Sequence, residues 1–276
     1  MTERGTPWAE EHQKQVPLLR TAFPAVNGGA NLFRAYGASR LAPFRRYDPR
    51  STSLQSSWML LYYITDRKQF AGTERGQRVA LLRRIAEAAR AGVDYIQLRE
   101  KDLAARELES LARHAVKVVR ENSDAAKLLI NGRTDIALAS DADGVHLPDG
   151  DLPASEVRTL WMKCSSRAPL IGVSAHSPEG ARYAEAHGAD FAVLAPVFEK
   201  SGTAAIGLAE LREACSALAA PGDVEGPYQG GFRVLALGGV NLANAGSCMS
   251  AGAAGVAGIR LFQFGDLLET VKRLRG

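Results

Sequence analysis

Residues 93–101 read Val-Asp-Tyr-Ile-Gln-Leu-Arg-Glu-Lys, an apolar run that turns abruptly polar and charged. We interpret the run as a buried strand whose carboxyl end carries Gln97, Arg99 and Lys101. In alternating β/α folds, ligands bind at the carboxyl ends of the parallel strands. Two cations and a carboxamide at such an end therefore predict a site for a phosphorylated, anionic small molecule.

Similar apolar runs recur from residue 58 onward. Runs of about five residues alternate with amphipathic stretches of about ten to seventeen, which is the rhythm of alternating strands and helices. The predicted strands span residues 59–65, 93–98, 127–131, 144–147, 170–173, 191–195, 233–237 and 255–259. Eight strands, each followed by a helix, in roughly two hundred residues predict a single (β/α)₈ TIM barrel of the α/β class. A doubly wound open sheet is the alternative.

The amphipathic stretches predict helices over residues 74–90, 104–120, 178–187, 241–251 and 265–274. Gly92 follows the first of these and is typical of a C-cap. Ser177 and Pro178 open the third as an N-cap followed by proline at the first helical position. Residues 133–140 leave room for only a short helix, and another helix is expected to start near Ala154. Residues 220–231 are rich in Gly and Pro and predict an exposed loop.

The first part of the chain differs from the rest. Residues 1–58 hold eight Lys and Arg against four acids, so the net charge of +4 belongs to this segment and the remainder sums to zero. We interpret residues 1–57 as a disordered basic extension or the product of a start codon placed too far upstream, a transit peptide being conceivable, and residues 58–276 as the barrel. Because the barrel is neutral, we expect no nucleic-acid partner.

The remaining composition indicates a cytoplasmic protein. No run is long and apolar enough to span a bilayer, and the first residues lack the apolar core of a signal peptide, so no membrane partner is expected. Cys164, Cys215 and Cys248 are far apart and lack the spacing of a metal site. In a reducing cytosol they are expected to be buried thiols.

Polar residues follow several predicted strands and would share one mouth of the barrel. The third and fourth strands are followed by Asn131, Arg133, Asp149 and Asp151. The two aspartates suit Mg²⁺, which prefers oxygen ligands and commonly bridges to phosphate, but loop aspartates also cap helices. His176 follows the fifth strand. Its unperturbed pKa lies near neutrality and suits general acid–base chemistry, the alternative being a cap for the next helix.

Glycines follow the last two predicted strands. Gly238 and Gly239 come after the seventh strand, and Gly258 and Ile259 come after the eighth. In barrels of this kind the loops after strands 7 and 8 form the usual phosphate pocket, where bare backbone N–H groups face the anion. A simple turn requirement is the alternative explanation for the glycines.

At these strand ends the sequence resembles the thiamine phosphate synthase / thiazole tautomerase family. The resemblance covers residues 59–276, and its motifs fall in the family's order at matching strand ends. They are Ile64-Thr65-Asp66, Gln97-Leu98-Arg99-Glu100-Lys101, Leu129-Ile130-Asn131, Asp143-Gly144-Val145-His146-Leu147, Ile171-Gly172-Val173-Ser174-Ala175-His176, Gly188-Ala189-Asp190-Phe191, Leu237-Gly238-Gly239-Val240 and Ala251-Gly252-Ala253.

The resemblance implies a (β/α)₈ fold and a role in thiamine biosynthesis. In the synthase branch, an aminopyrimidine diphosphate loses pyrophosphate to Mg²⁺ and cationic residues, and the nitrogen of a thiazole phosphate captures the resulting carbocation. The loops at Gly238-Gly239 and Gly258-Ile259 would hold phosphate, and a homodimer is the family expectation. The residues that would hold the diphosphate and pyrimidine are Gln97, Arg99, Lys101, Asn131 and Ser174.

Two regions depart from the synthase pattern. After Asn131 a synthase usually has a Mg²⁺-binding Asp, and here Gly132 and Arg133 follow instead, so Asp151 is the matched metal ligand that remains. After the sixth strand, residues 196–203 retain only Lys200 or Thr203 of a Pro-Thr-x-Thr-Lys loop.

These departures leave three interpretations open. The tautomerase branch isomerises a thiazole carboxylate phosphate without metal, and His176 would be its proton shuttle. A catalytically silent barrel that binds thiamine intermediates is the third possibility. Because the motif at residues 97–101 is intact and a pure tautomerase has no need of it, we favour a synthase-type transferase. Its catalytic candidates are Arg99, Lys101, Lys200 and His176.

Overall fold

The computed structural model describes residues 59–199, 202, 204–216 and 231–276. The predicted extension at residues 1–57, Lys200, Thr203 and nearly all of the predicted loop at 220–231 lie outside the described residues. All described residues belong to one compact unit that spans Gln55–Gly276.

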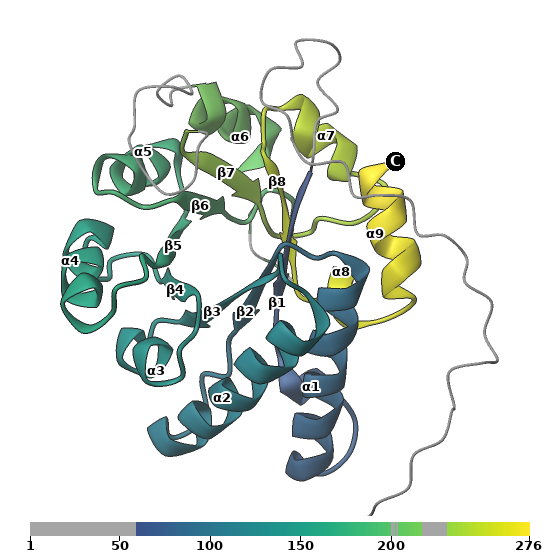
Figure 1. Cartoon of the computed structure of the whole chain (residues 1–276). Helices are drawn as coiled ribbons and strands as arrows, with labels where there is room; N and C mark the ends of the chain where they lie inside the picture. Colours follow the sequence, from purple (N-terminus) through teal and green to yellow (C-terminus); the bar gives the residue numbers. More distant parts are fainter. Residues whose placement is uncertain (1–58, 200–201, 203, 217–230) are drawn as a thin grey trace, which may run out of the picture. The chain divides into compact units, whose positions relative to one another are not determined.

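Eight parallel strands form the centre of this unit, as Figure 1 shows. Each strand pairs with the next, and β8 pairs back onto β1, with Leu60 opposite Gly255 and Tyr63 opposite Gly258. The predicted TIM barrel is therefore confirmed, and the open-sheet alternative is wrong because the first and last strands join. The strands are β1 Leu60–Ile64, β2 Tyr95–Leu98, β3 Lys127–Asn131, β4 Gly144–Leu147, β5 Leu170–Ala175, β6 Phe191–Leu194, β7 Arg233–Ala236 and β8 Gly255–Gly258.

Helices connect the strands and surround the barrel (Figure 1). Among the described residues, no helix is long and apolar enough to cross a membrane. The helices are η1 Arg67–Gln69, α1 Glu74–Ala91, α2 Ala105–Asn122, α3 Thr134–Ala139, α4 Ala154–Cys164, α5 Pro178–Ala186, α6 Gly207–Ser216, α7 Ala245–Ser250, α8 Arg260–Gln263 and α9 Leu267–Arg275.

Two helix ends follow their sequence signals. α1 stops at Gly92, whose φ of 91° is the left-handed conformation that glycine adopts without strain. α5 starts after Ser177, whose hydroxyl accepts a hydrogen bond from the N–H of Gly180 at 3.2 Å. Pro178 occupies the first helical position, where no N–H is required.

Three elements differ from expectation. α7 starts at Ala245 rather than at Asn241, because Asn244 Oδ1 accepts from the Asn241 N–H at 2.7 Å and closes a turn there. The pattern does not predict α6, which begins at Gly207, or α8, a single turn too short for a periodicity. The prediction of three buried cysteines is correct for Cys248 and wrong for Cys164, which is exposed at the end of α4.

The barrel interior is a packed core of inward-facing side chains. Tyr95 stacks on Phe191 with 5.3 Å between ring centroids, and Tyr62 lies edge-on to both rings. Gly172 makes room for this cluster, since a Cβ there would lie 2.3 Å from the Phe191 ring. The aromatic rings therefore fill the barrel beneath the side chains at the carboxyl ends of the strands.

One aspartate ties both ends of the barrel's sequence together. Asp94, directly before β2, accepts from the backbone N–H of Leu61 at 2.8 Å. The same carboxylate oxygen accepts from Arg275, the last residue of α9, at 2.6 Å. This contact joins residues 181 positions apart in the sequence, and it fixes α9 beside the strands that close the barrel.

Candidate active site

Two of the predicted site residues are linked through the barrel interior by a chain of hydrogen bonds. Gln97 Nε2 donates to the Tyr62 hydroxyl at 2.9 Å, and this hydroxyl lies 3.2 Å from His146 Nδ1. His146 Nε2 lies 3.0 Å from Ser174 Oγ. All of these side chains belong to β1, β2, β4 and β5, whose parallel order brings their carboxyl ends together.

The chain of hydrogen bonds has a direction. Because Gln97 donates to the Tyr62 oxygen, the Tyr62 proton goes to His146 Nδ1, and His146 donates from Nε2 to Ser174. Gln97 Oε1 is then left to accept from a ligand, and the Ser174 proton is left to be donated. An acceptor on β2 and a donor on β5 suit a planar ring that carries an amino group next to a ring nitrogen.

Burial keeps the middle of this chain neutral. Burial, and to a smaller extent the positive charge of Arg99, lowers the pKa of His146 to about 3. Burial also raises the pKa of Tyr62 above its usual range. His146, expected to be packed, is 3% exposed and is confirmed as an interior residue. Tyr62 is absent from the predicted site, although its inward position two residues before Ile64 is a signal for it.

Arg99 and Lys101 follow directly after β2, at the carboxyl end of the strand. Arg99 is half-buried and Lys101 is exposed, and neither makes an ion pair with any residue that the structure describes. Glu100 lies between them in sequence but turns the other way, into the protein, where it binds Arg67. Glu100 therefore does not pair with either cation on the surface.

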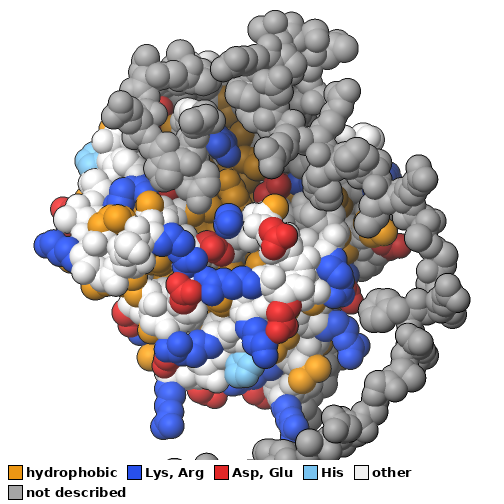
Figure 2. Space-filling model, in the orientation of Figure 1, with side chains coloured by type: hydrophobic (Ala, Val, Ile, Leu, Met, Phe, Trp, Pro, Cys, Tyr) orange, Lys and Arg blue, Asp and Glu red, His pale blue; other side chains and the backbone are white. Residues whose placement is uncertain are grey.

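Charges elsewhere on this face are mixed in sign. Figure 2 shows Lys and Arg side chains interspersed with Asp and Glu over α1 and α2. Examples are the pairs of Arg78 with Glu107 and of Arg113 with Glu109. The two cations after β2 are therefore a local feature of the strand end and not part of a broad basic surface.

The loop after β3 differs from its prediction. Asn131 is half-buried at the end of β3, in register with His146 of β4. Arg133 is half-buried and paired with Asp135 at 2.8 Å, so the structure does not bring it to the other site residues. Gly132 has a φ of 64°, and a Cβ there would meet only Pro148, at an ordinary 3.5 Å.

The predicted metal ligand lies on the exposed loop after β4. Asp151 Oδ1 accepts from the N–H of Leu152 at 2.8 Å, and Asp149 is exposed nearby in sequence. Neither aspartate caps α4, because its N-cap is Pro153 and receives no side-chain hydrogen bond. In the described part of the chain, no group of three or more His, Cys, Asp or Glu side chains has the arrangement of a metal site.

His176 is exposed just after β5 and has one defined contact. Its Nδ1 lies 2.8 Å from the carbonyl oxygen of Ala195. A carbonyl only accepts, so Nδ1 carries the proton and Nε2 is left as an acceptor. Ser177 alone caps α5, so the capping alternative for His176 is wrong.

Packing and backbone conformation explain the two glycines in the predicted phosphate loop after β7. Gly238 and Gly239 have φ values of 93° and 65°. A Cβ would lie 2.6 Å from Pro196 at Gly238 and 2.7 Å from Phe198 at Gly239. The close approach of the loop after β6 therefore requires both glycines, whatever they bind. The turn requirement, given above as the alternative explanation, accounts for Gly238 and Gly239.

Gly258 and Ile259 end β8 and lead directly into α8. Ile259 is the residue before the helix, and its carbonyl accepts from Phe262 and Gln263. Gln263 is buried and bonds both the N–H and the carbonyl of Asp66. The turn after β8 is thereby tied to the loop after β1.

The chain is similar to known proteins over the described barrel. The family model described as "Thiamine monophosphate synthase" matches residues 61–262. A thiamine-phosphate synthase of Syntrophomonas wolfei is 35% identical over 220 residues, 78% of this chain and 94% of that protein. One from Methanoculleus marisnigri is 36% identical over 221 residues, 78% and 93%. The solved thiamine phosphate pyrophosphorylase of Pyrococcus furiosus has a TM-score of 0.62 and 29% identity, covering 80% of this chain and 95% of that one.

Proposed function

The chain belongs to the thiamine monophosphate synthase family, and we propose from its site that it joins an aminopyrimidine diphosphate to a thiazole phosphate. The protein is a thiamine phosphate synthase-like transferase, and pyrophosphate is its second product. The relatives described above carry synthase names, so an isomerase is not favoured. One observation carries the proposal: Arg99 follows Gln97 after β2 and is near enough to the Gln97–Tyr62–His146–Ser174 chain for its charge to lower the pKa of His146. Neither Arg99 nor Lys101 has an acidic partner among the described residues.

Arg99 and Lys101 are proposed to bind the diphosphate. In the first step the bond between the pyrimidine methylene carbon and the bridging oxygen breaks, and both electrons leave with pyrophosphate. The two cations stabilise the charge that develops on the leaving group, because they are positioned before the reaction begins. The thiazole nitrogen then donates its lone pair to the carbocation, which gives thiamine phosphate. No proton moves in the bond-forming step.

Gln97 and Ser174 are proposed to orient the pyrimidine. Gln97 Oε1 would accept from the exocyclic amino group, and the Ser174 hydroxyl would donate to the adjacent ring nitrogen. Asn131, at the same end of the barrel, is proposed to bind the pyrimidine or the diphosphate. Lys200 keeps its predicted role as a further cation for the diphosphate, although it lies outside the described residues.

The thiazole phosphate is proposed to bind at the loops after β7 and β8. Gly238 and Gly239 supply one loop, and Gly258 and Ile259 supply the other. Backbone N–H groups suit a phosphate that must be held without adding a charge near the carbocation. His176 is proposed to face the same mouth through Nε2.

The donor set fits Mg²⁺ that arrives with the diphosphate. Mg²⁺ in enzymes is usually held by one or two carboxylates together with substrate phosphates and waters. Asp151 is the proposed protein ligand, with Asp149 as its neighbour, and Gly132 supplies no carboxylate. When bound, the ion would neutralise charge on pyrophosphate as it leaves.

Location and assembly follow the same proposal. Phosphorylated pyrimidine and thiazole molecules are the proposed partners, and a homodimer stays a prediction. A cytoplasmic location suits the three free cysteines.

Supplying both substrates to purified protein, with and without Mg²⁺, tests the function. Thiamine phosphate and pyrophosphate are expected in equal amounts. Arg99→Met is expected to lower kcat/KM about a hundredfold or more, since it removes a charge contact to the leaving group. Arg106→Met is the matched control, because Arg106 is exposed on α2.

Absence of thiamine phosphate at every Mg²⁺ concentration would overturn the proposal. Aromatisation of the non-aromatic thiazole carboxylate phosphate by the same sample would identify an isomerase instead. Binding of either substrate without any turnover would identify a silent barrel.

A further inference from the structure

The segment that carries Arg99 and Lys101 is held in place by the residue between them. Glu100 is 4% exposed. Its carboxylate accepts from the Thr65 hydroxyl at 2.6 Å, from the backbone N–H of Arg67 at 3.1 Å and from Arg67 Nη1 at 3.0 Å. Glu100 is therefore anchored in the wall between β1 and β2 and does not face the barrel mouth.

Thr65 makes a second tie to the same segment. It lies directly after β1 and is fully buried. Its hydroxyl oxygen accepts from the backbone N–H of Arg99 at 3.0 Å while its proton goes to Glu100. One hydroxyl thus fixes both the backbone at Arg99 and the side chain of the next residue.

Arg67 holds the other side of Glu100 and has no donor left for a ligand. A guanidinium has five N–H donors. In Arg67 they go to Glu74 at 2.9 and 3.2 Å, to Asp102 at 2.7 Å twice and to Glu100 at 3.0 Å. Arg67 follows β1 as a strand-end residue, but it is 2% exposed and fully engaged.

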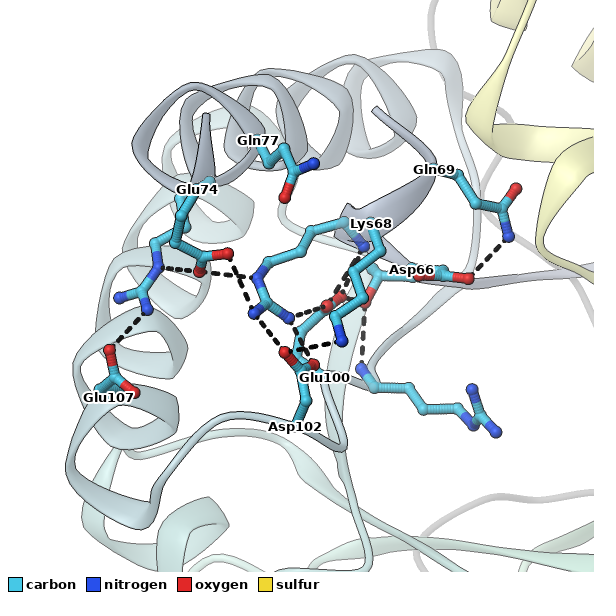
Figure 3. Close-up of polar contacts among 12 residues, drawn as sticks. Asp66, Lys68, Gln69, Glu74, Gln77, Glu100, Asp102 and Glu107 are labelled. Atoms are coloured by element: carbon cyan, nitrogen blue, oxygen red, sulfur yellow. Dashed lines mark hydrogen bonds and ion pairs between the residues drawn. The ribbon is translucent and has the colours of Figure 1, made fainter. Parts of the chain in front are cut away.

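Figure 3 shows the three carboxylates of Glu74, Glu100 and Asp102 converging from α1 and from the loop after β2. The Arg67 guanidinium keeps the pKa of Asp102 well below its usual range. Burial raises the pKa of Glu100, and the hydrogen bonds from Thr65 and Arg67 oppose that rise. The cluster is therefore an ion-pair network that joins three elements at one point.

We propose that Thr65, Arg67 and Glu100 are positioning residues that direct Arg99 and Lys101 toward the diphosphate. Neighbouring side chains of an extended segment point to opposite sides. Fixing Glu100 in the wall therefore sends the side chain of Arg99 to the other side. Lys101 follows in the turn that the Leu103 N–H closes on the Glu100 carbonyl at 3.3 Å. This inference rests on the proposed function, because it assigns the diphosphate as the anion that the two cations bind.

The positioning role has a consequence that a purely structural ion pair lacks. Loss of the Glu100 anchor lets the cations after β2 move, whereas the proposed thiazole phosphate loops after β7 and β8 lie on other strands. Affinity for pyrophosphate should then fall while affinity for thiazole phosphate is retained. A general loss of stability would weaken both ligands together.

The test uses Glu100→Gln and the pair Thr65→Val and Thr65→Ser in the full chain. Calorimetry with Mg²⁺ measures the Kd of pyrophosphate and, separately, of thiazole phosphate. Glu100→Gln and Thr65→Val are expected to raise the pyrophosphate Kd about tenfold, because displacement of a preorganised charge weakens its contact. Thr65→Ser keeps the hydroxyl and is expected to stay within about twofold of the wild type.

Lys68→Ala is the matched control. Lys68 pairs with Asp102 in the same cluster at 3.2 Å but is 61% exposed and does not contact Glu100. Its removal is expected to leave both affinities within about twofold, as for most exposed ion pairs. Melting temperatures of all variants identify any that fail to fold. If Glu100→Gln fails to fold, the comparison of Thr65→Val with Thr65→Ser still tests the proposal.

The outcomes separate this inference from the proposed function. If Glu100→Gln and Thr65→Val fold and bind pyrophosphate like the wild type, the positioning role is wrong even if thiamine phosphate is made. If both variants lose pyrophosphate affinity selectively but no thiamine phosphate forms, the positioning role is supported and the synthase activity is wrong. A wild-type chain that does not bind pyrophosphate overturns the inference.

Discussion

Tyr62 and His146 face each other across the interior of the barrel, with the tyrosine hydroxyl 3.2 Å from Nδ1 of the imidazole. Neither side chain reaches the surface, yet between them they connect Gln97 on β2 with Ser174 on β5. The pair decides which atoms of Gln97 and Ser174 remain available to the pyrimidine that we propose they bind. In that proposal, interior hydrogen bonds of this barrel belong to its recognition chemistry as much as to its stability.

Tyr62→Phe should weaken pyrimidine recognition. The variant removes the oxygen that receives Gln97 and the proton that goes to His146, so the amide is free to rotate. We expect KM for the aminopyrimidine diphosphate to rise about tenfold and stability to fall by about 1–2 kcal/mol. Steady-state kinetics and thermal unfolding measure the two effects.

Tyr63→Phe is the control for that change. Tyr63 belongs to the same strand, is equally buried and bonds Gln263 at 3.1 Å outside the chain of hydrogen bonds. A similar loss of stability with unchanged KM for the diphosphate is expected. Equal increases of KM in the two variants would argue against a specific role for Tyr62.

The buried His146 predicts acid sensitivity. Its pKa is lowered from 6.5 to about 3 in the folded protein by burial and then by Arg99. Between these values the unfolded chain binds a proton that the folded chain does not, so stability falls as pH decreases from about 6.5 toward 3. The contribution of this single site has a slope of about 1.4 kcal/mol per pH unit.

His146→Gln should flatten that dependence, because glutamine keeps hydrogen-bonding groups and does not titrate. Denaturant unfolding of both proteins between pH 7 and 4 measures the difference, because this range covers most of the interval between the two pKa values. Parallel curves for the two proteins would show that the folded chain protonates His146 at its ordinary pKa.

Gly238→Ala should destabilise the mouth of the barrel. The new Cβ would lie 2.6 Å from Pro196, and the φ of 93° is unfavourable for alanine. We expect a loss of about 2–3 kcal/mol, the size of other backbone clashes. Gly246→Ala on α7 meets nothing within 4 Å and should stabilise by about 0.5–1 kcal/mol. Thermal unfolding tests both, and equal effects would contradict the packing role of Gly238.

Gly132→Asp should increase the affinity of the enzyme for Mg²⁺. A Cβ at this position meets only Pro148 at 3.5 Å, and the φ of 64° lies where aspartate is tolerated better than most residues. A second carboxylate would lower the Mg²⁺ concentration for half-maximal rate about tenfold, and Asp151→Asn would raise it similarly.

Asp124→Asn serves as the control for the Mg²⁺ titrations, since Asp124 is exposed before β3, at the opposite end of that strand. It should leave the Mg²⁺ dependence unchanged. A Gly132→Asp protein that folds and shows the wild-type Mg²⁺ dependence would place the ion elsewhere.

Two variants of His176 distinguish a role in holding a loop from a role in proton transfer. Its Nδ1–H bonds the Ala195 carbonyl, and asparagine can supply the same donor without acting as a base. Because bond formation in the synthase moves no proton, His176→Asn should keep kcat within about threefold while His176→Ala loses about tenfold. Equal, large losses in both variants would indicate that the imidazole is a general base.

The fold was open to prediction because each strand carries its own local signal. β3 and β4 match their predicted bounds, since Lys127–Asn131 and Gly144–Leu147 are apolar runs with polar or glycine ends. α8 is a single turn and too short to show a periodicity. α6 was not predicted, although Leu208, Leu211 and Cys215 have helical spacing. Asn241 shows that side-chain turns can delay a helix that the pattern would start earlier.

The site was predictable only where the position of a residue along a strand determines the direction of its side chain. Gln97 and Ser174 sit where expected because strand alternation turns them inward. Arg67 and Arg133 share the same strand-end positions, yet both are taken by carboxylates. Which cation stays unpaired depends on where the fold places its acids. Arg133 pairs with Asp135 nearby in sequence, whereas Arg67 pairs with Asp102, 35 positions away, and the strand-end pattern does not contain that placement.

The contact between Asp94 and Arg275 has a consequence for synthesis in the cell. The residues of this contact are separated by 181 positions, and it secures the strand pairing that closes the barrel. A nascent chain therefore leaves β1 without its β8 neighbour until nearly the whole barrel has emerged from the ribosome. Translation at about 5–20 residues per second leaves that strand open for many seconds. Chaperones should bind during this interval to the edge of β1 that later pairs with β8. Ribosome profiling of chaperone-bound nascent chains would detect this binding.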